Sequence, residues 1–274
     1  MKITKILNNN AVVVKDGNVE KVAIGPGVAF QKRKNDIVNV HKIEKLFVME
    51  ENDKLQQLLN RIPEEYFIIS EEIISYAEQH IGTKLNEHIH IVLTDHISFA
   101  IEREREGIHL RNKLLNEIKI LYKREFEVGQ WAIKHIKEQL GIEMQEDEAA
   151  YIALHIHTMK PTGGDLQETI RQTKIIKDMV QTIKKHVNIV VEEDDLAYHR
   201  LITHLRFTLT RVDEYDIRTL DEEMIEMIKK KFPFSFQCAS SVAREVLLVH
   251  GISLPQQELG YITLHIERLR KQLD

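Results

Sequence analysis

Two segments of the chain, about 110 residues apart, have nearly the same sequence. Residues 148–156 read EAAYIALHI and residues 258–266 read ELGYITLHI, and a Gly-Ile pair precedes each of them, at Gly141 and Gly251. A second match has almost the same offset: His96, Phe99, Ile101 and Arg103 correspond to His204, Phe207, Leu209 and Arg211. Repetition at a fixed offset indicates a duplicated structural unit, so the chain is expected to contain two similar modules.

Four of the fourteen histidines recur in register in the two modules: His96, His155, His204 and His265. Residues four and seven positions apart share a helix face, so Glu148 and Tyr151 accompany His155, and Arg103 accompanies His96. A nearby arginine disfavours imidazolium and favours a bound anion, and neutral imidazole is the nucleophilic form. The pattern therefore favours histidines that accept a phosphoryl group, which adds roughly two negative charges.

Two other interpretations of these histidines remain open. Apolar residues flank His155, as is typical of a histidine that packs in a core. A metal site could use His88 with His90, or His155 with His157, but helix neighbours two positions apart do not face one site. Because His88, His90 and His157 have no counterparts in the second module, we expect neither a metal nor a cofactor.

The first 48 residues differ from the rest of the chain in charge. They hold nine Lys or Arg against four Asp or Glu, whereas the net charge of the whole chain is −5. A small basic segment attached to an acidic body is typical of a nucleic-acid-binding module joined to a different domain. A solvated lysine-rich surface explains the same charge equally well.

The same segment, the head of the chain, has the pattern of a small antiparallel β-sheet. Alternating apolar residues flank Asp16-Gly17, which predicts a hairpin, and further strands are expected at residues 28–31 and 43–48. Residues 25–27 (GPG) predict a turn. Turn backbone and Phe30 beside lysines could bind RNA bases and phosphates, unless Phe30 instead fills a small core. So small a sheet has limited stability alone, so we expect a homodimer.

From Glu50 onward the hydrophobic period changes from two to about 3.6, which indicates helices. A linker helix through Leu58 and Leu59 is expected to end before Pro63. In the first module this period predicts helices at residues 68–79, 91–106, 110–122, 126–140 and 146–159. In the second module it predicts helices at residues 169–186, 194–211, 220–231, 236–250 and 256–273. The expected parts are a β head (1–55), a linker (56–62), a helical module (63–160), a second linker (161–168) and a second helical module (169–274).

Composition excludes several classes of protein. An apolar fraction of 43% is sufficient for packed cores, and no apolar run has the length of a membrane helix or secretory signal, so a cytoplasmic protein without membrane insertion is expected. The single cysteine, Cys238, excludes an internal disulfide and a cysteine-based zinc site. No glycine-rich phosphate loop or nucleotide motif favours an enzyme.

Over essentially its whole length the chain resembles the bacterial transcriptional antiterminators of the BglG/SacY/LicT type. The resemblance lies in the opening residues 1–10 (MKITKILNNN), in residues 25–32 (GPGVAFQK) and in the two histidine-bearing modules. It implies a dimeric β-sheet RNA-binding head followed by two helical regulation domains of the sugar phosphotransferase system. Such a protein binds a hairpin in nascent messenger RNA and prevents an overlapping terminator from forming.

The resemblance also implies roles for individual residues. Positions at which family members contact RNA correspond to Lys5, Asn10, Gly25, Phe30 and Gln31. Pro26 departs from the family, because some relatives have arginine between the two glycines, and this change could alter the RNA preference.

The family's phosphorylated histidines correspond to His96, His155, His204 and His265. Asp95 precedes the first of them as in relatives, whereas Thr203 takes the equivalent place before His204. The implied phosphoryl donors are the phosphocarrier protein HPr and a sugar-specific permease component, and members differ in which module activates. Arg103 and Arg211 are the candidates for binding a phosphate placed among these histidines.

Two alternatives of other classes remain. One is a histidine phosphocarrier enzyme that acts on a small substrate. The other is a DNA-binding regulator with the same sensory modules, although the short β-rich head has no helix-turn-helix pattern.

Overall fold

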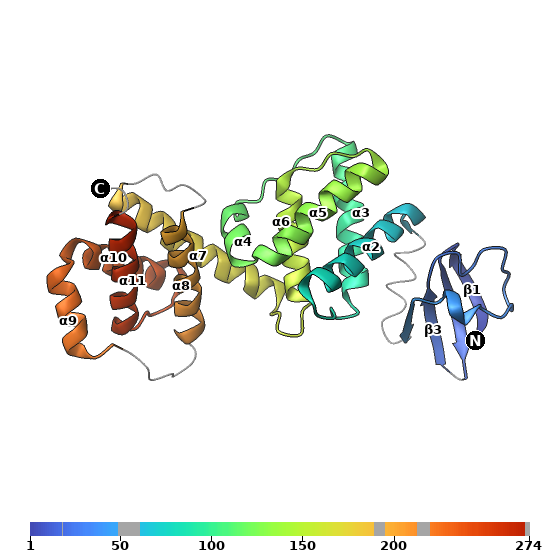
Figure 1. Cartoon of the computed structure of the whole chain (residues 1–274), viewed down its shortest axis with the longest axis horizontal. Helices are drawn as coiled ribbons and strands as arrows, with labels where there is room; N and C mark the ends of the chain where they lie inside the picture. The colour runs from blue at the N-terminus through green and yellow to red at the C-terminus, as the bar shows by residue number, and fades with distance from the viewer. Residues whose placement is uncertain (18, 49–60, 189–194, 213–219, 272–274) are drawn as a thin grey trace. The chain divides into compact units, whose positions relative to one another are not determined.

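The computed structural model describes residues 1–17, 19–48, 61–188, 195–212 and 220–271 (Figure 1). A small antiparallel sheet comes first along the chain, and helices make up the rest. The predicted fold class is thereby confirmed. The predicted linker helix through Leu58 and Leu59 lies outside the described residues, and so do position 194 and the last residues of the final predicted helix.

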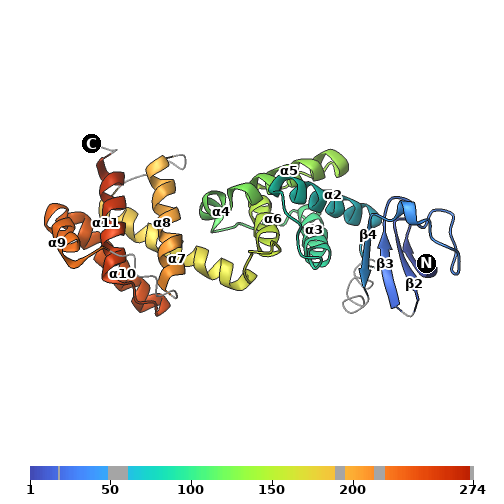
Figure 2. The ribbon, with the colours of Figure 1, turned by 60° about the horizontal axis from the view of Figure 1, so that its bottom comes forward.

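The head is a four-stranded sheet in the order β1 (Lys2–Asn8), β2 (Ala11–Asp16), β3 (Val19–Ile24) and β4 (Lys45–Val48) (Figure 2). The predicted hairpin is present, since Asp16 pairs with Val19 and Gly17 has a φ of +65°. Gly17 suits this turn because positive φ costs glycine little. Alternate residues of β2 enter two separate apolar clusters, which explains its continuous run AVVV: both faces of the strand are covered.

The predicted strand at residues 28–31 is wrong, because this segment forms successive turns. The Val28 amide donates to the Gly25 carbonyl at 3.0 Å, and the Phe30 amide donates to the Gly27 carbonyl at 3.2 Å. Gly27 and Gln31 have φ angles of +62° and +56°, outside the range of a strand. The apolar Val28 and Ala29 are buried because the turns pack on one face of the sheet.

The first helical module contains α2 (Glu64–Ile81), α3 (Ile89–Arg105), α5 (Lys123–Leu140) and α6 (Glu146–Thr158). Their apolar stripes form one core around Ile73, Leu93 and Ile97. Gly129 of α5 lies so close to α6 that an added Cβ would be 2.1 Å from the Ala149 carbonyl oxygen. This close approach fixes the position of α6, which carries His155.

The second module contains α7 (Leu166–Val187), α8 (Leu196–Val212), α9 (Glu222–Lys231), α10 (Pro233–His250) and α11 (Gln256–Lys271). The repeated glycines have one structural reason: Gly141 and Gly251 follow α5 and α10 directly and have φ angles of +68° and +71°. Glycine adopts this left-handed conformation without a Cβ penalty, so it ends each helix and redirects the chain.

Helix α4 (Leu115–Leu121) is shorter than the predicted helix at 110–122. Its late start follows from Asn112, whose side-chain oxygen accepts a hydrogen bond from the Leu114 amide at 2.9 Å and so forms a turn. Ile120 and Leu121 pack against the core of the second module. Accordingly, residues 112–123 belong to one compact unit with residues 164–274, and residues 1–111 form another with 124–163.

None of the helices within the described ranges has the length and apolar character needed to cross a membrane.

Candidate functional site

The four recurring histidines form two pairs. His96 of α3 lies beside His155 of α6, with ring centroids 4.8 Å apart and planes at 44°. In the second module, His204 of α8 and His265 of α11 have centroids 4.6 Å apart and planes at 27°. The repeated sequence therefore places two imidazoles together in each module.

A buried carboxylate joins a histidine to an arginine in each pair. In the first module, Glu148 Oε2 lies 3.3 Å from His96 Nε2, and Arg103 Nη2 donates to Glu148 Oε1 at 2.8 Å. The Glu148 side chain is only 2% exposed. This arrangement follows from the shared face of His96 and Arg103, two helical turns apart on α3.

The second module has the same groups at longer distances. Glu258 Oε2 lies 3.5 Å from His204 Nε2, and Arg211 Nε lies 3.6 Å from Glu258 Oε1. The Thr208 hydroxyl donates to Glu258 Oε2 at 2.6 Å. The residue at the position equivalent to Thr208 in the first module is Ala100, which has no hydroxyl.

In the first module, the pKa values of the buried carboxylate and of the second histidine are both shifted from their ordinary values. Burial acts to raise the pKa of Glu148, but His96 and Arg103 outweigh it and hold this pKa below its ordinary value. Burial and then the neighbouring His96 lower the pKa of His155 to about 4. His155 is consequently uncharged at neutral pH, which is the nucleophilic state of imidazole.

The second module repeats this distribution of charge. The pKa of Glu258 is raised by burial, but His204, Thr208 and Arg211 together keep it below its ordinary value. Burial, followed by the nearby charge of His204, lowers the pKa of His265 to about 4.

The paired histidines are partly accessible. The side chains of His96 and His204 are 15% and 13% exposed, and their Nε2 atoms have no hydrogen-bond partner among the described residues. His155 and His265 are likewise neither fully buried nor fully exposed. The four rings are therefore partly exposed, while the Nε2 atoms of His96 and His204 are buried and face the carboxylates of Glu148 and Glu258.

The histidines of the alternative metal clusters behave differently. His157 is buried with Nδ1 3.1 Å from Glu125 Oε1, and His90 is buried with Nδ1 2.5 Å from Glu71 Oε1. A core-packing role therefore applies to these two histidines. Within the part of the chain that the structure describes, no group of three or more His, Cys, Asp or Glu could hold a metal ion.

Two further contacts involve residues near the pairs. The carboxylate of Asp95, the candidate neighbour of the phosphate, lies 3.3 Å from Arg61 Nη2. Thr208 was not predicted, because a single polar residue in an apolar helix has no motif of its own. The signal available in the sequence was the difference between Ala100 and Thr208 in otherwise matching segments.

In the head, the turn of residues 25–31 is held by Asn10. Its side-chain oxygen accepts from the Gly27 amide at 2.5 Å, and its backbone oxygen accepts from the Gly25 amide at 2.9 Å. Phe30 is 59% exposed and therefore does not fill a core, and Gln31 is exposed beside it. An exposed aromatic ring on a turn, near basic residues in the sequence, has the chemistry required to stack a nucleic-acid base.

Two other predicted residues of the head have different environments. Lys5 is exposed on β1, where its charge is available to phosphate. Gly25 is buried, and an added Cβ would lie 1.8 Å from the Lys42 carbonyl oxygen. Glycine is thus required at this position by packing.

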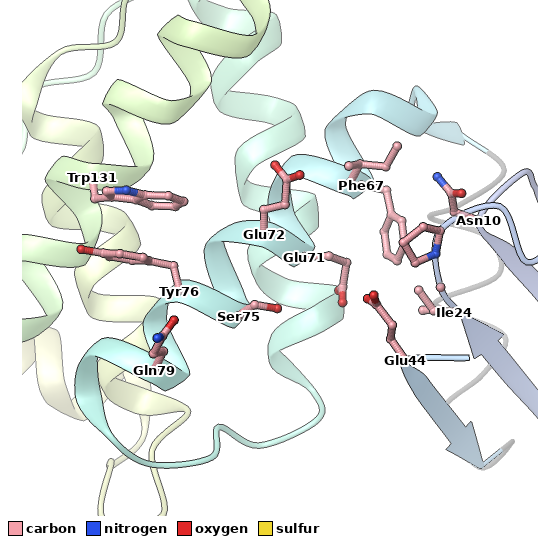
Figure 3. A pocket seen from close by; sticks show the side chains of 13 residues that line it. Asn10, Ile24, Glu44, Phe67, Glu71, Glu72, Ser75, Tyr76, Gln79 and Trp131 are labelled. Carbon is pink, nitrogen blue, oxygen red and sulfur yellow. The ribbon is translucent and has the colours of Figure 1, made fainter. Parts of the chain in front are cut away.

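A pocket between the turn of the head and α2 is lined by Asn10, Ile24 and several acidic residues (Figure 3). Figure 3 shows the carboxylates of Glu44 and Glu71 pointing toward one another, with Glu72 farther along α2. Stacked Tyr76 and Trp131, with centroids 4.0 Å apart, form its far side. The acidic lining disfavours an anionic ligand, so this pocket is separate in chemistry from the histidine pairs.

Comparisons with known proteins match different parts of the chain to two family models. Residues 1–56 match the CAT RNA binding domain, and residues 71–159 and 177–269 match the PRD domain. Transcription antiterminator LicT of Bacillus subtilis is 38% identical over 99% of this chain and 100% of its own length. The beta-glucoside operon antiterminator of Dickeya chrysanthemi is 37% identical over 100% of this chain and 98% of its own length. A crystal structure of GlcT CAT-PRDI, 34% identical, matches 59% of this chain and 98% of that chain with a TM-score of 0.55.

Proposed function

Because the chain belongs to the family of transcription antiterminators that join a CAT RNA-binding domain to PRD domains, we propose that it binds a messenger-RNA hairpin and prevents terminator formation in a sugar-utilisation operon. It is a regulator rather than an enzyme, as the sequence predicted. In this proposal, residues 1–55 bind RNA, residues 63–160 and 169–274 are the regulatory modules, and 56–62 and 161–168 link them.

The residues proposed for RNA binding are Lys5, Asn10, Gly25, Phe30 and Gln31, of which the buried Gly25 acts through the turn that it shapes. The exposure of Phe30 supports this role most directly, since an aromatic ring 59% exposed on a turn can stack on an RNA base. Asn10 acts by holding the turn that presents Phe30.

The observation that carries the regulatory part is the pairing of two partly exposed imidazoles, one of which burial keeps uncharged, beside a carboxylate and an arginine in both modules. In the proposed step, a ring nitrogen of the acceptor attacks the phosphorus of a donor phosphohistidine. The old P–N bond breaks, its electron pair goes to the leaving imidazole, and the acceptor's ring proton passes through solvent to that imidazole. HPr and a sugar-specific permease component are the proposed donors.

Phosphorylation would control RNA binding through the dimer. A phosphoryl group adds roughly two negative charges to a module, which either repels the twin module across a symmetric interface or attracts a guanidinium. Moving a two-state equilibrium from mostly off to mostly on takes about 5.5 kcal/mol of differential binding, which several charge-assisted hydrogen bonds supply.

The test uses the whole chain, HPr, its phosphorylating enzyme and a permease component, with acid-labile phosphate mapped by mass spectrometry. Phosphate on His96, His155, His204 or His265 is expected. Hairpin-RNA affinity is then measured for variants with each of these histidines changed to Ala or Asp, with duplex DNA as competitor. Four unchanged affinities together with an unchanged transcription reporter would contradict the proposal, and preferential binding of duplex DNA would favour a DNA-binding regulator.

A further inference from the structure

The two histidine pairs contain the same residues but differ in how the buried carboxylate is satisfied. In the first module, the Arg103 guanidinium donates to Glu148 at 2.8 Å, and Glu148 Oε2 has no hydrogen-bond partner among the described residues. In the second module, Thr208 supplies the hydrogen bond to Glu258 at 2.6 Å, and this threonine is completely buried.

The arginines differ accordingly. Arg211 comes no closer than 3.6 Å to the Glu258 carboxylate, which is beyond hydrogen-bond distance, and its Nε donates to the Phe207 carbonyl of its own helix at 3.3 Å. Its terminal amino groups make no hydrogen bond within the described residues. The side chain of Arg211 is 35% exposed, against 23% for Arg103.

The arginines differ because a different residue stands four positions after the first histidine of each pair: Ala100 after His96 and Thr208 after His204. A buried carboxylate needs donors, and a charged donor is used when no neutral one is near. Ala100 offers none, so Glu148 is bound by Arg103, whereas Thr208 offers a hydroxyl, so Glu258 is satisfied without a close arginine.

We propose that Thr208 is a positioning residue that occupies Glu258 and thereby leaves the Arg211 guanidinium available to bind a phosphoryl group on His204 or His265, whereas Arg103 is held by Glu148. This inference rests on the proposed histidine phosphorylation and makes the two modules unequal phosphate sites. The second module binds the phosphoryl dianion with a charge-assisted hydrogen bond, and the first leaves it to solvent.

The first test is structural and needs no phosphorylation. In a crystal structure of the Thr208→Val variant, which preserves the volume of the side chain, Arg211 is expected to move to hydrogen-bond distance of Glu258, as Arg103 does with Glu148. Thr208→Ser, which keeps the hydroxyl, is expected to leave Arg211 in place. An Arg211 that does not move in Thr208→Val would overturn the proposal.

The second test measures the phosphoryl group itself. The whole chain is phosphorylated with phosphoramidate, a small-molecule donor whose P–N bond breaks to release ammonia as imidazole nitrogen takes the phosphoryl group and passes its ring proton to the ammonia. A background with His96 and His155 changed to Ala reports the second module, and one with His204 and His265 changed to Ala reports the first. The second ionisation of the phosphoryl group is followed by ³¹P NMR against pH.

A bound guanidinium favours the dianion, so the ionisation midpoint is expected to lie about one pH unit lower in the second module, a tenfold change in acid dissociation constant. Thr208→Val should remove this difference, Thr208→Ser should retain it, and Ala100→Thr should lower the midpoint in the first module. Equal midpoints in both modules, or the same result for Thr208→Ser and Thr208→Val, would refute the positioning role. Because phosphoramidate requires no protein donor, failure of HPr to phosphorylate the chain would be a separate result.

Discussion

The imidazole rings of His96 and His155 lie with their centroids 4.8 Å apart, and they come from helices α3 and α6 that pack side by side in one core. The His96 ring therefore affects the charge of His155. A positive charge on His96 opposes a second one on His155, and burial acts in the same direction. The pair consequently has one member that stays neutral under ordinary conditions.

The first prediction concerns this neutral state. In an NMR titration of ring ¹⁵N shifts, His155 is expected to remain uncharged down to about pH 4, the value to which burial and His96 lower its pKa. The same result is expected for His265, where burial and His204 have this effect. A midpoint at the ordinary value near 6.5 for either ring would contradict the burial and pairing seen here.

The same shifts predict how stability depends on pH. Between about pH 6.5 and pH 4 the unfolded chain takes up protons at these histidines and the native chain does not, so the free energy of unfolding should decrease as pH falls through this window. Changing His155 to Asn should flatten this slope in urea unfolding measured at several pH values. An unaltered slope would mean that the native ring titrates normally.

The second prediction concerns the buried carboxylates. Glu148→Gln should lower the free energy of unfolding by about 2 to 3 kcal/mol, because Arg103 loses its charged partner inside the module. Glu258→Gln should cost only about 1 kcal/mol, because Arg211 is farther away and the Thr208 hydroxyl can still donate to the amide oxygen. Urea denaturation of the two variants measures the difference, and equal losses would argue against it.

The third prediction concerns the exposed aromatic ring of the head. Phe30→Ala should weaken binding of a hairpin RNA by about 1 to 3 kcal/mol, the usual contribution of one stacked base, with little change in melting temperature. Ile37, which is 74% exposed, is the matched control, and Ile37→Ala should leave RNA affinity unchanged. Fluorescence anisotropy with a labelled hairpin would show equal effects of both variants if Phe30 had no contact with RNA.

The fourth prediction separates two glycines of the head. Gly25→Ala should prevent the head from folding normally, because its Cβ would overlap the Lys42 carbonyl, a backbone group that cannot rotate away. Gly17→Ala has open space around it and should cost only about 1 kcal/mol, from its positive φ. Circular dichroism melting of both variants tests this order, and a stable Gly25→Ala head would show that the turn can move.

Hydrophobic periodicity and the internal repeat predicted the architecture, because each signal depends on residues close together in sequence and the helical signal occurs in both modules. The Asp16-Gly17 hairpin depends on a single turn, and each helical module repeats an amphipathic pattern that the other confirms. The recurrence of His96 and His155 in the second module was also visible in the sequence, but their pairing was not. What the repeat could not give was the distance between them, which depends on how α3 packs against α6.

Other features depended on contacts between distant residues. The segment at 28–31 has apolar residues like a strand, but hydrogen bonds from the Val28 and Phe30 amides to the Gly25 and Gly27 carbonyls close it into turns. The Asn112 side chain delays the start of α4 by a hydrogen bond to the Leu114 amide, and helix propensity alone does not predict such a bond. The Arg61–Asp95 ion pair and the Thr208–Glu258 hydrogen bond both join residues far apart in sequence, so neither has a local signature.

Helix α4 comes from the first repeat, yet Ile120 and Leu121 belong to the core of the second compact unit. A carboxy-terminal fragment that begins after residue 163 would consequently lack the α4 side chains that cover part of its hydrophobic core. The apolar side chains that α4 covers would then be exposed to water. Expression of the carboxy-terminal half by itself should yield a less soluble product than one that also carries residues 112–123. The repeats seen in the sequence are thus not the pieces into which the folded chain can be divided.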